Sequence, residues 1–135
     1  MEVCVLFKTN KQIGNTSLGI AIAYFSSHGY VVSLPLNDTQ DYDLVVDDGS
    51  SLLKIQAKGT SYRTKYNIFQ VALKSMGGSK GRFYKTVKDT KIDYLFVVTA
   101  DKDLYLIPNS LIKNKYTLNL GDAYQKYLLK TCTSK

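Results

Sequence analysis

The sequence predicts an α+β fold of the mixed α/β kind, in which a twisted sheet is flanked by helices. One apolar run near the N-terminus has the spacing of a helix, and six shorter runs have the β-branched, aromatic or alternating residues typical of strands. A chain of 135 residues has room for one hydrophobic core. We therefore expect a single domain that spans residues 1–135.

The first part of the chain predicts a helix followed by three strands. Apolar side chains recur at helical spacing within residues 16–28, and Gly29 ends this helix, as glycine commonly does. Turn residues at 37–40 and an Asp-Gly hairpin at 47–49 separate the strands that follow. We expect these strands, paired in an antiparallel or mixed sheet, at residues 30–36, 42–46 and 52–58.

The remainder of the chain predicts further strands and a closing helix. Residues 76–81 form a flexible loop with three glycines. A final helix is expected over residues 122–130, where apolar residues fall on one helical face. The strands that extend the sheet are expected at residues 67–73, 92–99 and 104–108, the last two joined as a hairpin.

Charge is distributed unevenly along the chain. The formal net charge is +7, residues 38–48 hold five acids and no cation, and residues 54–91 hold ten cations and one acid. Such a distribution suits a metal-assisted phosphodiester cleaver, because carboxylates bind a hard divalent cation and lysines bind the phosphate backbone. A charged turn beside a solvated surface explains the same composition equally well.

Several other classes of protein are disfavoured. Cys4 and Cys132 lie near opposite ends without a C-x-x-C spacing, so neither a zinc site nor a disulfide framework is expected. No apolar run approaches the roughly 20 residues that cross a bilayer. Glu2 stands where a signal peptide is basic. We expect a soluble cytoplasmic protein without a membrane partner.

Three polar side chains fall on two strands that a hairpin makes neighbours. Asp43 lies at the start of the second strand, directly before an apolar run. Gln56 and Lys58 are separated by one residue on the third strand, so the strand period of two puts both on one face of the sheet. A carboxylate, an amide oxygen and an ammonium group are therefore expected to converge there as the catalytic residues.

These three groups can hydrolyse a phosphodiester bond. Asp43 and Gln56 are the expected ligands of Mg²⁺, for which Mn²⁺ can substitute, because both supply hard oxygen atoms. The cation lowers the pKa of a bound water. Lys58 stabilises the transition state or helps to orient the nucleophile.

The same residues carry a family resemblance. Residues 42–46, with their acid at Asp43, and residues 55–58, with the sequence Ile-Gln-Ala-Lys, resemble the PD-(D/E)XK nuclease superfamily in the variant where glutamine replaces the second acid. The likeness is to the homing endonucleases associated with cyanobacterial group I introns. It implies a restriction-endonuclease-like core and a metal-dependent endodeoxyribonuclease that cuts double-stranded DNA at specific sites.

One position departs from that family's pattern. Its members often carry a metal-binding glutamate in the first helix, and the matching position here is Leu18. Three alternatives stay open. The remaining ligands suffice together with water and phosphate, or Asn15, Ser17 or Asp41 replaces the missing acid, or the domain has kept DNA binding and lost cleavage.

The basic stretch after Lys58 predicts a DNA-binding surface. Hydroxyls and lysines contact phosphates, and Arg63 can read a guanine edge or a narrow minor groove. The glycine-rich basic segment at residues 76–91 either follows a groove of the DNA or is a solvated loop. The residues expected to contact DNA are Thr60, Ser61, Tyr62, Arg63, Lys65, Lys80, Arg82 and Lys85.

The resemblance and the small size of the chain imply a homodimer or homotetramer, since one active site cuts one strand and 135 residues offer little surface to specify a long DNA site. A catalytically silent DNA-binding or interaction module on the same fold is the competing hypothesis. A DNA junction-resolving nuclease, which recognises DNA shape, is a third.

Overall fold

The structure is a computed structural model that describes residues 9–37, 39–77, 83–86, 90–113 and 116–129. Within these residues it has one α-helix, a mixed five-stranded sheet and two small two-stranded sheets, which confirms the predicted α+β class. Short 3-10 helices are labelled η. The elements are α1 (Asn10–Ser27), β1 (Val31–Ser33), β2 (Leu44–Asp47), β3 (Leu52–Thr60), β4 (Gln70–Ala72), β5 (Lys74–Gly77), β6 (Phe83–Thr86), β7 (Tyr94–Thr99), β8 (Leu104–Pro108), η2 (Asn109–Leu111), β9 (Thr117–Asn119) and η3 (Asp122–Tyr127).

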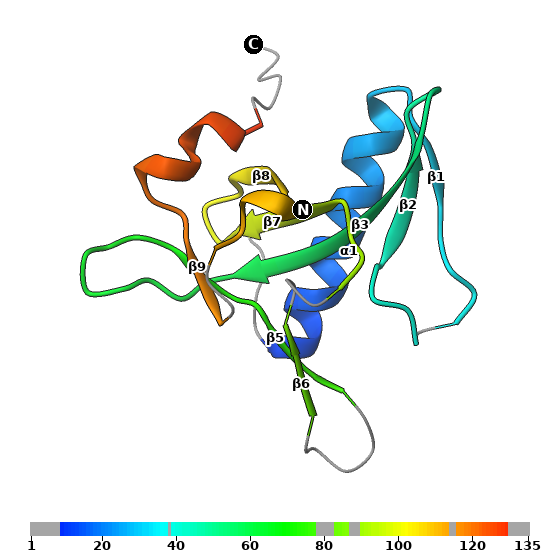
Figure 1. The fold of residues 1–135 in the computed structure, drawn as a ribbon. Coiled ribbons are helices and arrows are strands. Elements are labelled where there is room, and N and C mark those ends of the chain that lie inside the picture. Colours follow the sequence, from blue (N-terminus) through cyan, green and yellow to red (C-terminus); the bar gives the residue numbers. More distant parts are fainter. Residues whose placement is uncertain (1–8, 38, 78–82, 87–89, 114–115, 130–135) are drawn as a thin grey trace, which may run out of the picture.

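The main sheet has the strand order β1-β2-β3-β7-β8 (Figure 1). Strand β3 pairs antiparallel with β2 and parallel with β7, so it joins the N-terminal strands to the C-terminal hairpin β7–β8. Gln56 and Lys58 both lie on β3, paired with Leu95 and Val97 of β7. The two strands that carry the predicted site, β2 and β3, are therefore neighbours, as the sequence predicted.

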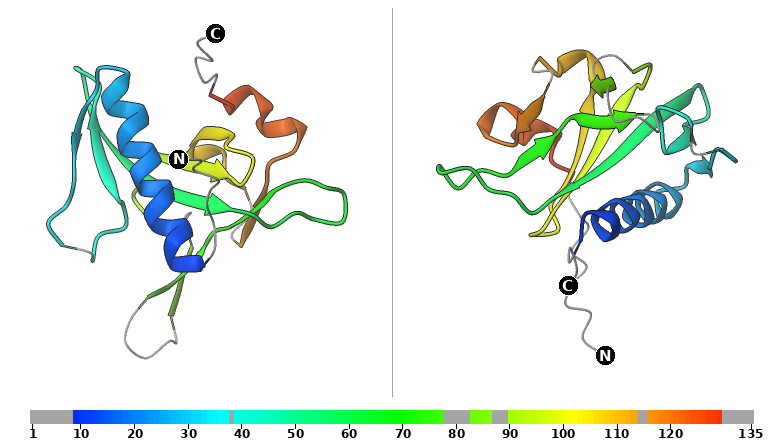
Figure 2. Two further views of the ribbon diagram at one scale, coloured as in Figure 1. Left: turned by 180° about the vertical axis from the view of Figure 1, so that it is seen from behind. Right: turned by 90° about the horizontal axis from the view of Figure 1, so that it is seen from below.

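Helix α1 covers one face of the sheet (Figure 2). Ala21 and Phe25 of the helix share a buried cluster with residues from three strands, Leu44, Ile55 and Phe96. Leu18 lies one turn earlier on α1 and packs against the edge of this cluster. Burial of this apolar face fixes the helix over β2 and β3.

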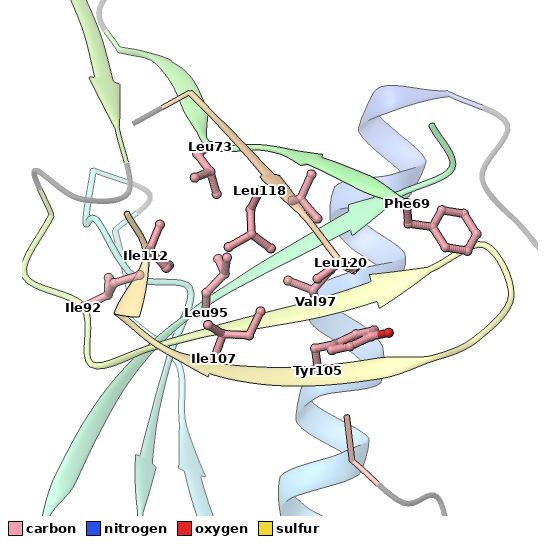
Figure 3. Close-up of a cluster of buried hydrophobic side chains, with 11 residues drawn as sticks. Phe69, Leu73, Ile92, Leu95, Val97, Tyr105, Ile107, Ile112, Leu118 and Leu120 are labelled. Atoms are coloured by element: carbon pink, nitrogen blue, oxygen red, sulfur yellow. The ribbon is translucent and has the colours of Figure 1, made fainter. Parts of the chain in front are cut away.

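A second cluster covers the opposite face (Figure 3). Leu95 and Val97 of β7 pack there with Val71 of β4 and Leu118 of β9. Since Phe96 lies between them in sequence and belongs to the cluster under α1, β7 is buried on both faces. That double burial explains why residues 94–99 read as a continuous apolar run rather than an alternating one.

The helix is longer than predicted. It begins at Asn10 because Thr9 caps it, its side chain accepting the N–H of Gln12 at 3.2 Å. Gly14 lies inside the helix although glycine weakens helices. Tertiary packing of the helix stabilises this first part. No helix within the described ranges is long and apolar enough to cross a membrane.

Other predicted elements differ in extent or type. Strands β1 and β4 are three residues long and therefore shorter than the predicted runs. Met76 and Gly77 belong to β5 rather than to a loop, and residues 78–81 lie outside the described residues. The C-terminal segment forms the 3-10 helix η3 instead of an α-helix, because apolar spacing alone does not distinguish the two over so short a stretch.

Helix α1 approaches β3 closely at Gly59. A Cβ atom at this position would lie 2.6 Å from Cγ2 of Ile13 and closer still to Oγ of Ser17. Ser17 is fully buried, and its hydroxyl donates to the carbonyl of Ile13 at 2.6 Å. Because Gly59 directly follows Lys58, this contact fixes the part of β3 that carries the candidate site.

Gly59→Ala is expected to lower the free energy of unfolding by about 1–3 kcal/mol, because the added methyl group pushes α1 away from β3. Gly19→Ala is the matched control on the helix itself, since no atom lies within 4 Å of a Cβ atom there. At an exposed helix position alanine is more stable than glycine by about 1 kcal/mol, so Gly19→Ala should not lower the free energy of unfolding. Urea denaturation measures both variants, and unchanged stability of Gly59→Ala would contradict the close packing.

Candidate active site

Asp43 lies directly before β2 and is held by two hydrogen bonds to β3. Its N–H donates to the carbonyl of Ile55 at 2.9 Å, and its Oδ2 accepts the N–H of Ala57 at 2.8 Å. The paired residues of β2 and β3 end at Leu44 and Ile55. Beyond this pair, the side chain of Asp43 accepts the backbone N–H of Ala57 on β3. Within the described part of the chain, Oδ1 of Asp43 receives no hydrogen bond.

The Asp43 carboxylate and the Lys58 ammonium group influence each other. Burial raises the pKa of Asp43 above its ordinary value, opposed by the Ala57 N–H and by the positive charge of Lys58. Burial likewise lowers the pKa of Lys58, opposed by Asp43. Desolvation outweighs attraction for both groups. The two charges do not form a contact ion pair, so each can contact a further group.

Gln56 has a buried amide oxygen without a partner. Its Oε1 is buried and takes part in no hydrogen bond. An unpaired buried polar atom costs about 1–3 kcal/mol. Such atoms are uncommon in folded proteins and are often explained by a function or by a bound ion or water.

The alternation along β3 places Gln56 and Lys58 together. Ile55 and Ala57 belong to the cluster under α1 or pack against it. The strand period of two therefore turns Gln56 and Lys58 to the opposite face. Both residues lie close to Asp43, because Asp43 is hydrogen-bonded to the backbone of Ile55 and Ala57, the residues on either side of Gln56.

A pocket of about 260 Å³ opens beside Asp43 and is called the Asp43 pocket here. Leu18 of α1 and Asp43 both line it. The helix position at which the family resemblance implies an acid thus borders the same pocket as Asp43. Leucine makes this wall of the pocket apolar.

None of the three substitutes for the missing acid lines the Asp43 pocket. Ser17 is fully buried against Gly59 with its hydroxyl donated to Ile13. Asn15 is exposed and Asp41 is half-buried, each outside the pocket lining. Gln56 and Lys58 do not line this pocket either, and of the residues named for the site only Asp43 and Leu18 do so.

The available oxygen atoms fit a hard divalent cation. Oδ1 of Asp43 and Oε1 of Gln56 are both without a hydrogen-bond donor among the described residues. Those residues contain no group of three His, Cys, Asp or Glu side chains suited to a metal. Mg²⁺ keeps several waters and is commonly held by one or two carboxylates together with substrate phosphates, so a sparse set of oxygen ligands suffices.

The predicted DNA-binding residues fall into three groups. Thr60 and Arg63 bind other residues of the chain: buried Thr60 donates to the carbonyl of Gln70, and exposed Arg63 pairs with Asp101 and has its guanidinium carbon 3.9 Å from the centre of the Phe69 ring. Ser61, Tyr62 and Lys65 are exposed on the loop between β3 and β4. Lys80 and Arg82 lie outside the described residues, and Lys85 lies in β6, where only the backbone is described.

The acids of the β2–β3 turn have a structural role, as expected. Asp47 Oδ1 accepts the N–H of Gly49, and Asp48 Oδ1 accepts those of Ser50 and Ser51, all at 2.7 to 2.8 Å. These bonds lower the pKa of Asp48. The carboxylates close the turn rather than contribute to the site.

Sequence reasoning missed the loop between β1 and β2 as part of the site. Leu34, Pro35 and Leu36 line the Asp43 pocket, and both leucines are exposed. The available signal was the presence of apolar residues in a segment assigned partly to a turn. It also missed Ala57, whose N–H positions the carboxylate of Asp43.

Comparison with known proteins identifies the family. The model of the PD-(D/E)XK endonuclease family matches residues 8–126, a range that includes Asp43, Gln56 and Lys58. The chain therefore belongs to the PD-(D/E)XK endonuclease family, as the sequence motif indicated.

The fold is also similar to the solved structure of a bacterial homing endonuclease, I-Ssp6803I. The two share 23% sequence identity over 89% of this chain and 87% of that chain, with a TM-score of 0.66. A search of the curated proteins found no match. Membership of an endonuclease family and a likeness to this fold are thus established independently.

The raised pKa of Asp43 predicts a pH dependence of stability. The folded state binds the Asp43 proton more tightly than the unfolded state does, because the pKa is raised by folding. This group therefore stabilises the fold fully at pH values below 3.8, its ordinary pKa, and loses that contribution as the pH rises through the pKa of the folded state. Asp43→Asn removes the titration and can keep an oxygen for the Ala57 N–H. The difference in the free energy of unfolding between variant and wild type should therefore grow in favour of the variant across this window.

Denaturant unfolding at a series of pH values measures that difference. Asp41→Asn is the matched control, because Asp41 lies nearby and outside the pocket lining. A difference for Asp43→Asn that stays flat between pH 3 and 7 would contradict a desolvated carboxylate at this position.

Proposed function

We propose that this protein is a divalent-metal-dependent endodeoxyribonuclease that hydrolyses phosphodiester bonds in double-stranded DNA at specific sites. The observation that supports this most strongly is the group formed by Asp43, Gln56 and Lys58: a fixed carboxylate, an unpaired buried amide oxygen and a partly desolvated ammonium. Membership of an endonuclease family sets the reaction class.

Asp43 and Gln56 would hold the cation, Mg²⁺ or in its place Mn²⁺, through Oδ1 and Oε1. A divalent cation bound there supplies Lewis-acid chemistry, because it polarises a phosphate oxygen and lowers the pKa of water. The Ala57 N–H keeps the Asp43 carboxylate in place by binding its other oxygen. Ionisation of Asp43 is needed for this role, so activity should fall as the pH drops and Asp43 becomes protonated.

Lys58 would bind the scissile phosphate. Its ammonium is half-buried, so its attraction to an anion is less weakened by water than that of an exposed lysine. The incoming phosphate favours the protonated form and opposes the lowering of the Lys58 pKa. The ammonium then stabilises the negative charge that develops in the transition state.

The exposed residues of the loop between β3 and β4 would contact the DNA backbone. Ser61, Tyr62 and Lys65 continue directly from the strand that bears Lys58. Arg63 would hold this loop in shape through Asp101 and Phe69 instead of reading a base. Lys80, Arg82 and Lys85 stay proposed backbone contacts, and the protein would act as a homodimer or homotetramer so that both strands are cut.

A catalytically silent DNA-binding module is the competing function. The observation that favours it is Leu18, which places an apolar side chain where an acid could complete the ligand set. A junction-resolving nuclease would use the same residues and differ in the DNA shape that it recognises.

Nicking of supercoiled plasmid in the presence of Mg²⁺ or Mn²⁺ tests the proposal. Lys58→Ala is expected to reduce the rate by roughly 100-fold or more, because the positive charge that stabilises the anionic transition state is lost. Lys54→Ala is the matched control, since Lys54 lies on the same face of β3 and is exposed. Leu18→Glu is expected to strengthen the binding of the divalent cation by adding a carboxylate to the Asp43 pocket.

The outcomes separate the two functions. Wild-type protein that retains plasmid in a gel-shift assay but nicks it with neither cation would favour the silent module. Equal rates for Lys58→Ala and Lys54→Ala would remove Lys58 from the catalytic group.

A further inference from the structure

The Asp43 pocket has a rim of exposed apolar residues that the cleavage chemistry does not use. Leu36 is 101% exposed and Leu34 is 56% exposed, and both line the pocket that contains Asp43. Pro35 lies between them, fixes its own backbone angle and disfavours the helical region for Leu34. The two leucines therefore stand on a stiff segment at the mouth of the candidate active site.

The polar groups of the Asp43 pocket are neutral, apart from Asp43. Asn37, Gln40 and Tyr42 are the other polar residues of the lining, and the Tyr42 ring also packs against the second core cluster, with the Lys54 ammonium 5.6 Å from its centre. No lysine or arginine is present among the described residues that line it. An additional phosphate would find no cation in the lining itself, whereas a flat neutral group with a polar edge would meet apolar residues together with Asn37 and Gln40.

The size of the Asp43 pocket limits its occupant. A volume of about 260 Å³ is below the roughly 300–1,000 Å³ of pockets that hold drug-sized ligands. One nucleobase suits this space better than a larger ligand does. Side chains that hold a base outside the DNA stack are of these kinds: apolar and aromatic walls, with hydrogen-bonding groups for the base edge.

We propose that the Asp43 pocket receives one unstacked nucleobase from the nucleotide next to the scissile phosphate. This rests on the proposed nuclease function, which places that phosphate at Asp43 and Lys58. Successive phosphates of one strand are about 3.4 Å apart along the duplex axis, so a base that flanks the cut lies within reach of a pocket that shares Asp43. Leu18 and Leu36 contact the base faces, and Asn37 and Gln40 bond its edge.

The leucine at position 18 has a function under this proposal. An acid there would bring a second charge into the Asp43 pocket and disfavour an apolar base face. Leucine removes one metal ligand and provides a wall for the base. The DNA step at the cut is then selected by how easily it unstacks, which makes Leu34 and Leu36 determinants of substrate preference.

Two DNA probes of identical sequence test this, one fully paired and one with a single unpaired base. The base is a fluorescent adenine analogue whose emission rises when it leaves the stack. In EDTA, wild-type protein is expected to bind the probe with the unpaired base roughly tenfold more tightly than the paired probe and to raise its emission. The reason is that an unpaired base leaves the stack at a lower free-energy cost. Leu36→Ser should lose both effects.

Leu52→Ser is the matched control. Leu52 is also an exposed leucine, 69% accessible, and it pairs with Asp47 at the far end of β3 from the site. This variant should keep the preference and the emission change of the wild type. Circular dichroism of both variants confirms that the fold is retained, which is expected for exposed positions.

The outcomes distinguish the base pocket from the nuclease function. Binding and Mg²⁺-dependent cleavage without preference or emission change would overturn the pocket and leave the nuclease proposal intact. Preference and emission change without cleavage would support the pocket and contradict the nuclease. Absence of DNA binding would overturn both, and equal losses in Leu36→Ser and Leu52→Ser would overturn the role of Leu36.

Discussion

The fold holds a carboxylate and an ammonium group half-buried and close together, yet without a contact ion pair. Both charges lose solvation that their mutual attraction does not restore, and Gln56 adds an unpaired buried oxygen beside them. An arrangement that served stability alone would pair these groups or replace them by apolar side chains. The cost is understandable if a cation and a phosphate complete the set, and the other features of the site follow from that requirement.

The scaffold around these groups explains how the cost is sustained. Ala57 supplies one hydrogen bond that fixes Asp43, and Gly59 lets α1 pack tightly against β3. Buried clusters on both faces of the sheet secure β7 beside β3. A site on a central strand between two apolar layers has little freedom to move, which suits the precise positioning that phosphoryl chemistry needs.

The sequence predicted the parts that depend on local pattern. The strand period placed Gln56 and Lys58 on one face, and the turn at residues 47–49 made their strand a neighbour of Asp43. The first helix was predicted from its apolar spacing but not its start, because Gly14 was read as a helix boundary and the close contact of Ile13 and Ser17 with Gly59 depends on the folded chain. Family membership followed from the motif and is confirmed by the family match.

Contacts between distant segments were not predictable. Arg63 was expected at DNA, but its partner Asp101 is 38 residues away, and no local pattern indicates such a pair. The Asp43 pocket likewise combines the middle of α1 with the loop after β1. A leucine at position 18 and leucines at 34 and 36 are unremarkable in sequence, and only the fold brings them to the carboxylate.

Calorimetric titration with Mn²⁺ tests the central claim most directly, because it measures cation binding without DNA or cleavage. Binding to wild-type protein should weaken in Gln56→Leu, which removes the amide oxygen, and strengthen in Gln56→Glu, which adds a charge. Affinity that is the same in all three proteins would contradict a cation held by Asp43 and Gln56.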